Sequence, residues 1–100
     1  MGSKKVEFHE AASLEFEAAF AWYFERSERA ALRFAREVER AVTLVSEAPD
    51  RFPAGVRGTR RFLLQRFPFA LVYRELPSVI QVLAVAHGRR RPNYWKARVL

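Results

Sequence analysis

The sequence predicts an α+β protein with two layers, in which a helical hairpin covers one face of an antiparallel sheet of about four strands. Three observations support this prediction. The first half of the chain has apolar residues at helical spacing, the second half has short alternating segments separated by Pro and Gly, and one strand-like segment precedes the helices. The predicted order is β-α-α-β-β-β, and an amphipathic hairpin must bury its apolar side against such a sheet.

Length and composition indicate a single domain that spans residues 1–100, with residues 1–4 as a disordered or cloning-derived leader. Half of the residues are hydrophobic and 14% are aromatic, which is enough to form one core without disulfide bonds or a structural metal ion. The chain has no cysteine, so disulfides and thiolate metal sites are excluded. The sequence has no signal-peptide pattern and no apolar run as long as a membrane span, so we expect a cytoplasmic protein without a membrane partner.

The first half of the chain predicts a short strand and two helices. Residues 5–9 alternate polar and apolar, and residues 10–26 then follow a helical period. Ser27 can cap a second helix, which Pro49 ends. The apolar side of this second helix is formed by Ala31, Phe34, Ala35, Val38, Ala41, Val42 and Val45.

The second half predicts three strands after a Pro- and Gly-containing loop at residues 48–55. These strands are residues 60–65, 69–74 and 79–87, and Pro68 interrupts the pattern between the first two. Because the hairpin can cover only one face of the sheet, we expect the other face to stay open.

The two halves differ in charge. Residues 1–50 have a balance of −3, whereas residues 51–100 have a balance of +10, with Glu75 as the single acidic residue. A solvated surface usually interleaves both signs, because like charges repel one another. The second half therefore indicates an anionic partner, either nucleic acid or an acidic protein segment.

Three segments carry a family resemblance: SERAALRFAREVERAV, RRFLLQRFPFALVYRE and VLAVAHGRRRPNYW. Together with the element order, they resemble the RelE/ParE superfamily of toxins from bacterial type II toxin–antitoxin modules, over residues 6–98. The resemblance implies a plasmid-stabilisation type of protein, with the first strand beside the last. It also implies an antitoxin that wraps the toxin and neutralises it.

Arginines are the main candidates for binding the target. If the predicted strands pair, their arginines join those of the C-terminal segment in one basic surface, and the guanidinium fork suits phosphates and carboxylates. The alternative is that the C-terminal arginines only solubilise a terminus. The candidates for contacting the target or nucleic acid are Arg60, Arg61, Arg66, Arg74, Arg89, Arg90 and Arg91. For the antitoxin they are Trp22, Arg74 and Arg90.

A catalytic role is assigned only for the case of a ribonuclease. His87 would then be the general acid, with Arg89 and Tyr94 beside it, and Tyr94 could also stack on a base. The other interpretation makes His87 a packing residue, and we expect Trp95 to fold back onto the core. Since His9 is the only other histidine and the acids do not cluster, we expect no metal, no cofactor and no small-molecule substrate.

Three functions remain open from the sequence. The three predicted strands of the second half contain no lysine, and Glu75, beside a turn, is the sole acid there, so the base is the weak link in a ribonuclease. This favours a ParE-like toxin that binds DNA gyrase over an enzyme. The alternatives are a RelE-like ribosome-dependent mRNA endoribonuclease and a non-toxic relative that only binds an antitoxin. In a toxic protein, we expect alanine at Arg89, Arg90 and Arg91 to abolish toxicity while the fold survives.

Overall fold

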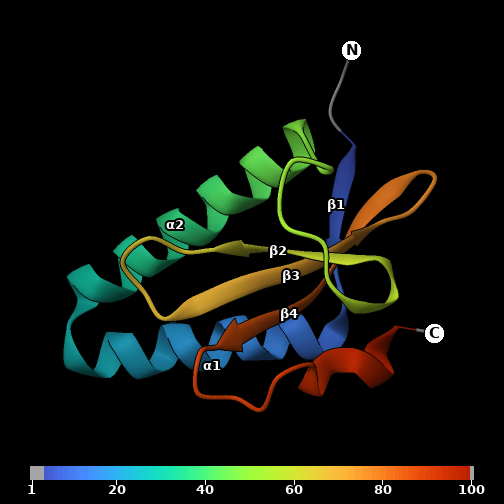
Figure 1. Cartoon of the computed structure of the whole chain (residues 1–100). Helices are drawn as coiled ribbons and strands as arrows, with labels where there is room; N and C mark the ends of the chain where they lie inside the picture. The colour runs from blue at the N-terminus through green and yellow to red at the C-terminus, as the bar shows by residue number, and fades with distance from the viewer. Residues whose placement is uncertain (1–3, 100) are drawn as a thin grey trace.

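A computed structural model describes residues 4–99 of the chain (Figure 1). The predicted order is confirmed, and the first helix has the predicted bounds. Residues 1–3 of the proposed leader lie outside the described residues. Lys4, however, is part of the fold, because its ammonium group contacts the Leu76 carbonyl and the Glu75 carboxylate, each at 2.8 Å. The elements are β1 (Lys5–Phe8), α1 (Glu10–Arg26), α2 (Glu28–Glu47), η1 (Val56–Gly58), β2 (Thr59–Leu63), β3 (Phe69–Glu75), β4 (Val79–His87) and η2 (Tyr94–Arg98).

The four strands form one sheet in the order β1-β4-β3-β2. The first strand lies beside the last, as the resemblance implies. The sheet is mixed, however, because β1 runs parallel to β4 while the other pairs are antiparallel. The expectation of a wholly antiparallel sheet is therefore corrected for this pair. Alternation along a strand indicates which side chains are buried, but it does not indicate the direction of a partner that lies some 70 residues away.

The two helices pack on one side of the sheet and form the main core (Figure 1). Phe34 of α2 is fully buried between four aromatic rings. These rings come from α1 and from the β2–β3 connection and β3: Phe16, Tyr23, Phe67 and Phe69. The apolar period of α2 and the Phe-Pro-Phe segment therefore meet in the same core. None of the helices formed by residues 4–99 is long and apolar enough to cross a membrane.

Ser27 connects the two helices and caps the second one, as the sequence predicts. Its Oγ accepts a hydrogen bond from the Ala30 amide at 3.2 Å, which satisfies one of the free N–H groups at the start of α2. We expect Ser27→Ala to lower the free energy of unfolding by about 1 kcal/mol. Urea unfolding followed by circular dichroism measures this change. Ser27→Asp should keep most of the stability, since aspartate also caps, and equal losses for both variants would contradict the capping role.

The second face of the sheet is partly covered, contrary to the expectation that it stays open. The chain turns at Asn93, which has a left-handed backbone conformation (φ 61°), and η2 then folds onto the sheet. Trp95 is buried there, as predicted for this side chain, against Val72, Leu83 and Ala84. The segment after β4, residues 88–99, is called the tail below. It shields the part of the sheet nearest β4 and leaves the part nearest β2 accessible.

Candidate binding groove

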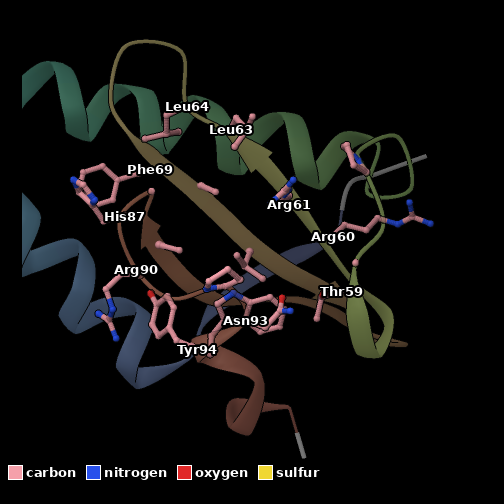
Figure 2. A pocket seen from close by; sticks show the side chains of 18 of the residues that line it. Thr59, Arg60, Arg61, Leu63, Leu64, Phe69, His87, Arg90, Asn93 and Tyr94 are labelled. Atoms are coloured by element: carbon pink, nitrogen blue, oxygen red, sulfur yellow. The ribbon is translucent and has the colours of Figure 1, made fainter.

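The accessible part of this face forms a groove of about 640 Å³ (Figure 2). Its floor contains small and apolar residues of β3 and β4, including Ala70, Val72 and Ala86. One side is formed by β2 and residues 53–56, and the opposite side by the tail. Arginines border both sides, namely Arg60, Arg61, Arg90 and Arg91. The groove thus combines an apolar floor with positively charged walls, an arrangement that suits an extended anionic or amphipathic segment.

Strand register decides which arginine of β2 faces the groove. Arg61 pairs with Val72, whose side chain packs under the tail, so Arg61 lies on the open face. Arg60 pairs with the core residue Tyr73 and has the opposite orientation. Its guanidinium Nη1 donates a hydrogen bond to the Phe52 carbonyl at 2.8 Å. Arg60 therefore borders the groove with its charge directed toward a loop carbonyl, whereas Arg61 is exposed and faces the groove.

Three of the predicted basic residues lie outside the groove lining. Arg74 is on the open face, but at the far end of β3, where its Nε donates to Gln81 Oε1 at 2.9 Å. Arg66 lies in the β2–β3 connection, and its amide is 3.4 Å from Glu37 Oε1 on the helical layer. Arg89 is exposed at the start of the tail. The single basic surface expected from the sequence is therefore reduced to Arg61, Arg90 and Arg91, with Arg60 at its border.

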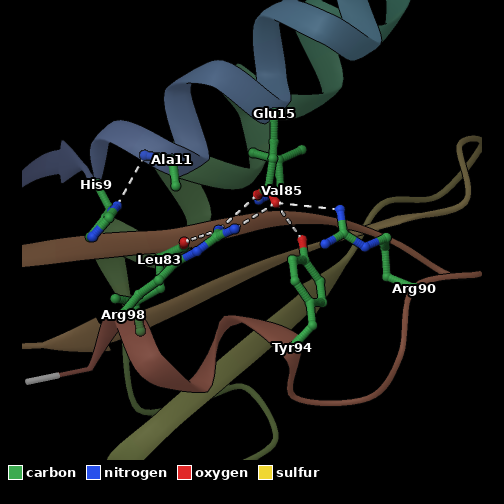
Figure 3. A network of polar contacts seen from close by, with 8 residues as sticks. All are labelled: His9, Ala11, Glu15, Leu83, Val85, Arg90, Tyr94 and Arg98. Atoms are coloured by element: carbon green, nitrogen blue, oxygen red, sulfur yellow. Dashed lines mark hydrogen bonds and ion pairs between the residues drawn. The ribbon is translucent and has the colours of Figure 1, made fainter.

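The tail is fastened to α1 by a carboxylate that sequence reasoning did not single out (Figure 3). Glu15 accepts hydrogen bonds from the Tyr94 hydroxyl at 2.7 Å and from the Arg98 guanidinium at 3.0 and 2.9 Å. It also accepts from the Val85 amide at 3.0 Å, and the same guanidinium donates to the Leu83 carbonyl at 2.8 Å. The side chains of Glu15 and Arg98 are only 16% and 18% exposed.

These hydrogen bonds complete the free edge of β4. The parallel partner β1 pairs only with residues 79–82, so the amide of Val85 and the carbonyl of Leu83 have no neighbouring strand. Glu15 and Arg98 provide the acceptor and the donor that such a strand would supply. In the sequence, Glu15 is one of several acids on an amphipathic helix, and no local signal separates it from the others.

The network shifts the protonation equilibria of its members. Burial raises the pKa of Glu15, but the hydrogen bonds from Arg98, Tyr94 and the Val85 amide, together with the Arg98 charge, outweigh burial and hold its pKa below 4.5. The hydrogen bond to Glu15, together with its charge, raises the pKa of Arg98. Burial and the hydrogen bond to Glu15 both raise the pKa of the Tyr94 phenol. At neutral pH the network is therefore a carboxylate that binds a neutral phenol and a guanidinium cation.

Arg90 is supported by this network. Its guanidinium carbon lies 3.8 Å above the centre of the Tyr94 ring, and its Nη1 is 4.0 Å from Glu15 Oε2. A cation over an aromatic face is held electrostatically, and Tyr94 is itself held by Glu15. The wall of the groove formed by Arg90 is thus fixed through Tyr94 to α1 (Figure 3).

Of the three candidate catalytic residues, His87 and Tyr94 line the groove and Arg89 does not. His87 lies at the end of β4 with its ring against Phe69, 5.0 Å between centres, and its Nδ1 accepts from the Arg89 amide at 3.0 Å. A neutral His87 therefore carries its proton on Nε2. The Tyr94 hydroxyl is directed away from the groove, toward Glu15. His87 and Tyr94 both line the groove, and Arg89 contacts His87 through its amide, but the Tyr94 hydroxyl is bound by Glu15. Within residues 4–99, no three His, Asp or Glu side chains are placed to hold a metal ion.

Trp22, the third antitoxin candidate, lies on the helical layer and not in the groove. Its ring is 52% exposed, and the Arg26 guanidinium stacks over it at 3.7 Å. Trp22, Arg74 and Arg90 therefore belong to three separate regions: α1, the far end of β3 and the tail. A partner that contacts all three would have to wrap around the molecule.

Comparisons with solved structures agree with this fold. The chain is similar to the chromosomal ParDE toxin–antitoxin system of P. aeruginosa, with a TM-score of 0.74, 20% identity, and coverage of 85% of this chain and 96% of the other. A mutant of the E. coli toxin RelE in the free state gives a TM-score of 0.68 at 17% identity, covering 98% and 99% of the two chains. The isolated E. coli RelE toxin gives 0.62 at 21% identity, covering 98% and 100%.

No curated protein matches the sequence. The family of the ParE toxin of type II toxin–antitoxin systems (parDE), in contrast, matches residues 6–92. This match covers β1, both helices, the three remaining strands and the start of the tail. The chain therefore belongs to the ParE toxin family.

Proposed function

We propose that this protein is the toxin of a type II module, that a cognate antitoxin neutralises it, and that it arrests growth by binding DNA gyrase. The observation that favours gyrase over RNA cleavage is that Tyr94 lines the groove but has its hydroxyl bound to Glu15. Its phenol donates to Glu15 and its ring supports Arg90, so it acts in holding a binding surface. Such a target places the action of the toxin in the cytoplasm.

The groove supports binding more strongly than RNA cleavage. Cleavage through the 2′-hydroxyl requires a base, an acid and cations around the phosphate. Arg61, Arg90 and Arg91 could supply the cations. Glu15, the carboxylate that fastens the tail, is already bound to Arg98 and Tyr94 and is not free to act as a base. Among the described residues, no carboxylate or lysine lines the groove beside His87, so the surface is better suited to hold a partner than to cleave one.

Purified toxin should inhibit supercoiling by gyrase in a dose-dependent manner and stabilise cleaved DNA complexes. Addition of a cognate antitoxin should restore supercoiling, because it competes for the toxin. A parallel reaction with a translating extract measures transcript cleavage by primer extension. Intact transcripts together with inhibited gyrase are the expected result. Cuts within translated codons with unaffected gyrase would instead establish the ribonuclease, and growth without inhibition on induced expression would indicate a non-toxic relative.

A further inference from the structure

Helix α2 carries a second positively charged surface, on the layer opposite the groove. Four arginines occur at positions i, i+4, i+7 and i+11 of the helix, and all four are exposed. At 100° per residue they fall within an arc of roughly 60°, directly opposite the buried stripe that contains Phe34 and Val38. We call this surface the α2 arginine ridge, and it consists of Arg29, Arg33, Arg36 and Arg40.

The arginines of the α2 arginine ridge lower the stability of the helix that carries them. Like charges at spacings of three and four residues repel one another, as in the pairs Arg29–Arg33 and Arg36–Arg40. Arg29 also lies in the first turn of α2, where the helix dipole disfavours a cation. Glu37 and Glu39 lie between Arg36 and Arg40, but no acidic residue lies between Arg29 and Arg36.

Internal carboxylates do not neutralise the ridge. Glu37 is the acid best placed within α2, but its Oε1 accepts the Gln65 amide at 3.0 Å and lies 3.4 Å from the Arg66 amide. Among residues 4–99, the ion pairs found involve other cations. The four guanidinium groups therefore keep their charge available to a partner.

The ridge is separate from the groove. It lies on α2, the layer behind the sheet in Figure 1, whereas the groove is on the face partly covered by the tail. A shallow hollow of about 460 Å³ lies along the first half of the ridge, lined by Glu28, Arg29, Leu32, Arg33 and Arg36. The protein can thus bind one partner through the groove and another through α2.

We propose that the α2 arginine ridge binds duplex DNA. The ridge lies on the outward side of α2, and an α-helix with its side chains is roughly 10–12 Å wide. The major groove of B-DNA is about 12 Å wide and admits such a helix, whereas the major groove of A-form RNA is too narrow. Successive ridge arginines rise by about 4.5–6 Å along the axis, so several of them can reach phosphates, for which the guanidinium fork is suited.

The contacts proposed for the ridge arginines are to phosphates, so we expect binding with little sequence preference. Hydrogen bonds to phosphates fix position but carry no sequence information. This inference does not depend on gyrase as the target. It concerns a different face of the molecule, and the groove can fail as a gyrase site while the ridge still binds DNA.

Fluorescence anisotropy with a labelled short DNA duplex of arbitrary sequence tests the proposal. The full chain is compared with a variant in which all four ridge arginines are glutamine. A matched control replaces four exposed cations outside both surfaces with glutamine: Arg51, Arg57, Arg89 and Lys96. The ridge variant should bind at least tenfold more weakly than the control, although the net charge of the two variants is the same. Its slope of log affinity against log salt should be smaller by about 0.9 for each phosphate that the variant no longer binds.

Circular dichroism should show that both variants keep the fold, because every replaced side chain is exposed. An equal weakening in the two variants would overturn the proposal, since net charge alone would then explain binding. A duplex RNA that binds as tightly as DNA through the ridge would contradict the major-groove argument. A poly-glutamate peptide provides a further comparison. If it bound more tightly than DNA, and only when the ridge is intact, the partner would be an acidic protein segment. The proposal of DNA binding would then be overturned.

Discussion

Replacement of Arg61, Arg90 and Arg91 with alanine is expected to abolish growth inhibition while the protein still folds. These three side chains are exposed and line the open-face groove, and each presents a charge that a bound partner would pair with. The loss of several charge pairs at an interface should weaken binding by on the order of 100-fold. Colony survival after induced expression measures toxicity, and the inhibition of gyrase supercoiling measures the interaction directly.

The tail provides a matched control for this variant. Arg89 is adjacent to Arg90 in the sequence and is also exposed, but it does not line the groove. Arg89→Ala should therefore remain toxic, which narrows the expectation from the sequence that all three consecutive arginines are needed. If the groove variant accumulated as a folded protein and still arrested growth, the groove would not be the target site. Loss of toxicity on changing Arg89 alone would place the target-binding site on the exposed start of the tail, outside the groove.

Glu15→Ala is expected to lower the free energy of unfolding by roughly 3 kcal/mol. The substitution leaves the mostly buried Arg98 guanidinium without its carboxylate and removes the acceptor for the Tyr94 hydroxyl and the Val85 amide. The tail then loses its main attachment to α1. Urea unfolding at neutral pH measures the change, and increased hydrogen exchange of residues 94–98 should show where it acts.

Glu17→Ala is the control, because Glu17 is an exposed glutamate on the same helix. It should change the stability by less than about 0.5 kcal/mol. A double-mutant cycle with Arg98→Met isolates the pair, and the double variant should be more stable than the sum of the two single effects predicts. Strict additivity would mean that Glu15 and Arg98 do not stabilise one another.

The contribution of Glu15 should also depend on pH. Its pKa in the folded protein lies below the ordinary value of 4.5, so the folded state holds the carboxylate more firmly than the unfolded state does. The resulting stability is present above that ordinary value and is lost as the pH falls through the lower pKa of the folded state. The difference between the wild type and Glu15→Ala should therefore shrink in acid, and a difference that stayed constant down to about pH 2 would contradict a charged Glu15.

The order of the elements, the hairpin with its Ser27 cap, the burial of Trp95 and the resemblance to the RelE/ParE toxins could all be predicted from the sequence. These features follow from local periods, from caps and from short motifs, which act between residues close in the chain. They do not need the positions of distant residues. The excess of arginine in the second half was visible at the same level.

Which of these arginines share a surface could not be predicted from the sequence, because it depends on strand register and on the path of the tail. Arg60 and Arg61 are neighbours in the sequence but point to opposite faces of the sheet, and Arg74 and Arg90 lie at opposite ends of it. The parallel pairing of β1 with β4, and the binding of Arg98 by Glu15, join residues more than 70 positions apart. Strand register and long-range packing set such pairings, and neither leaves a local signal in the chain.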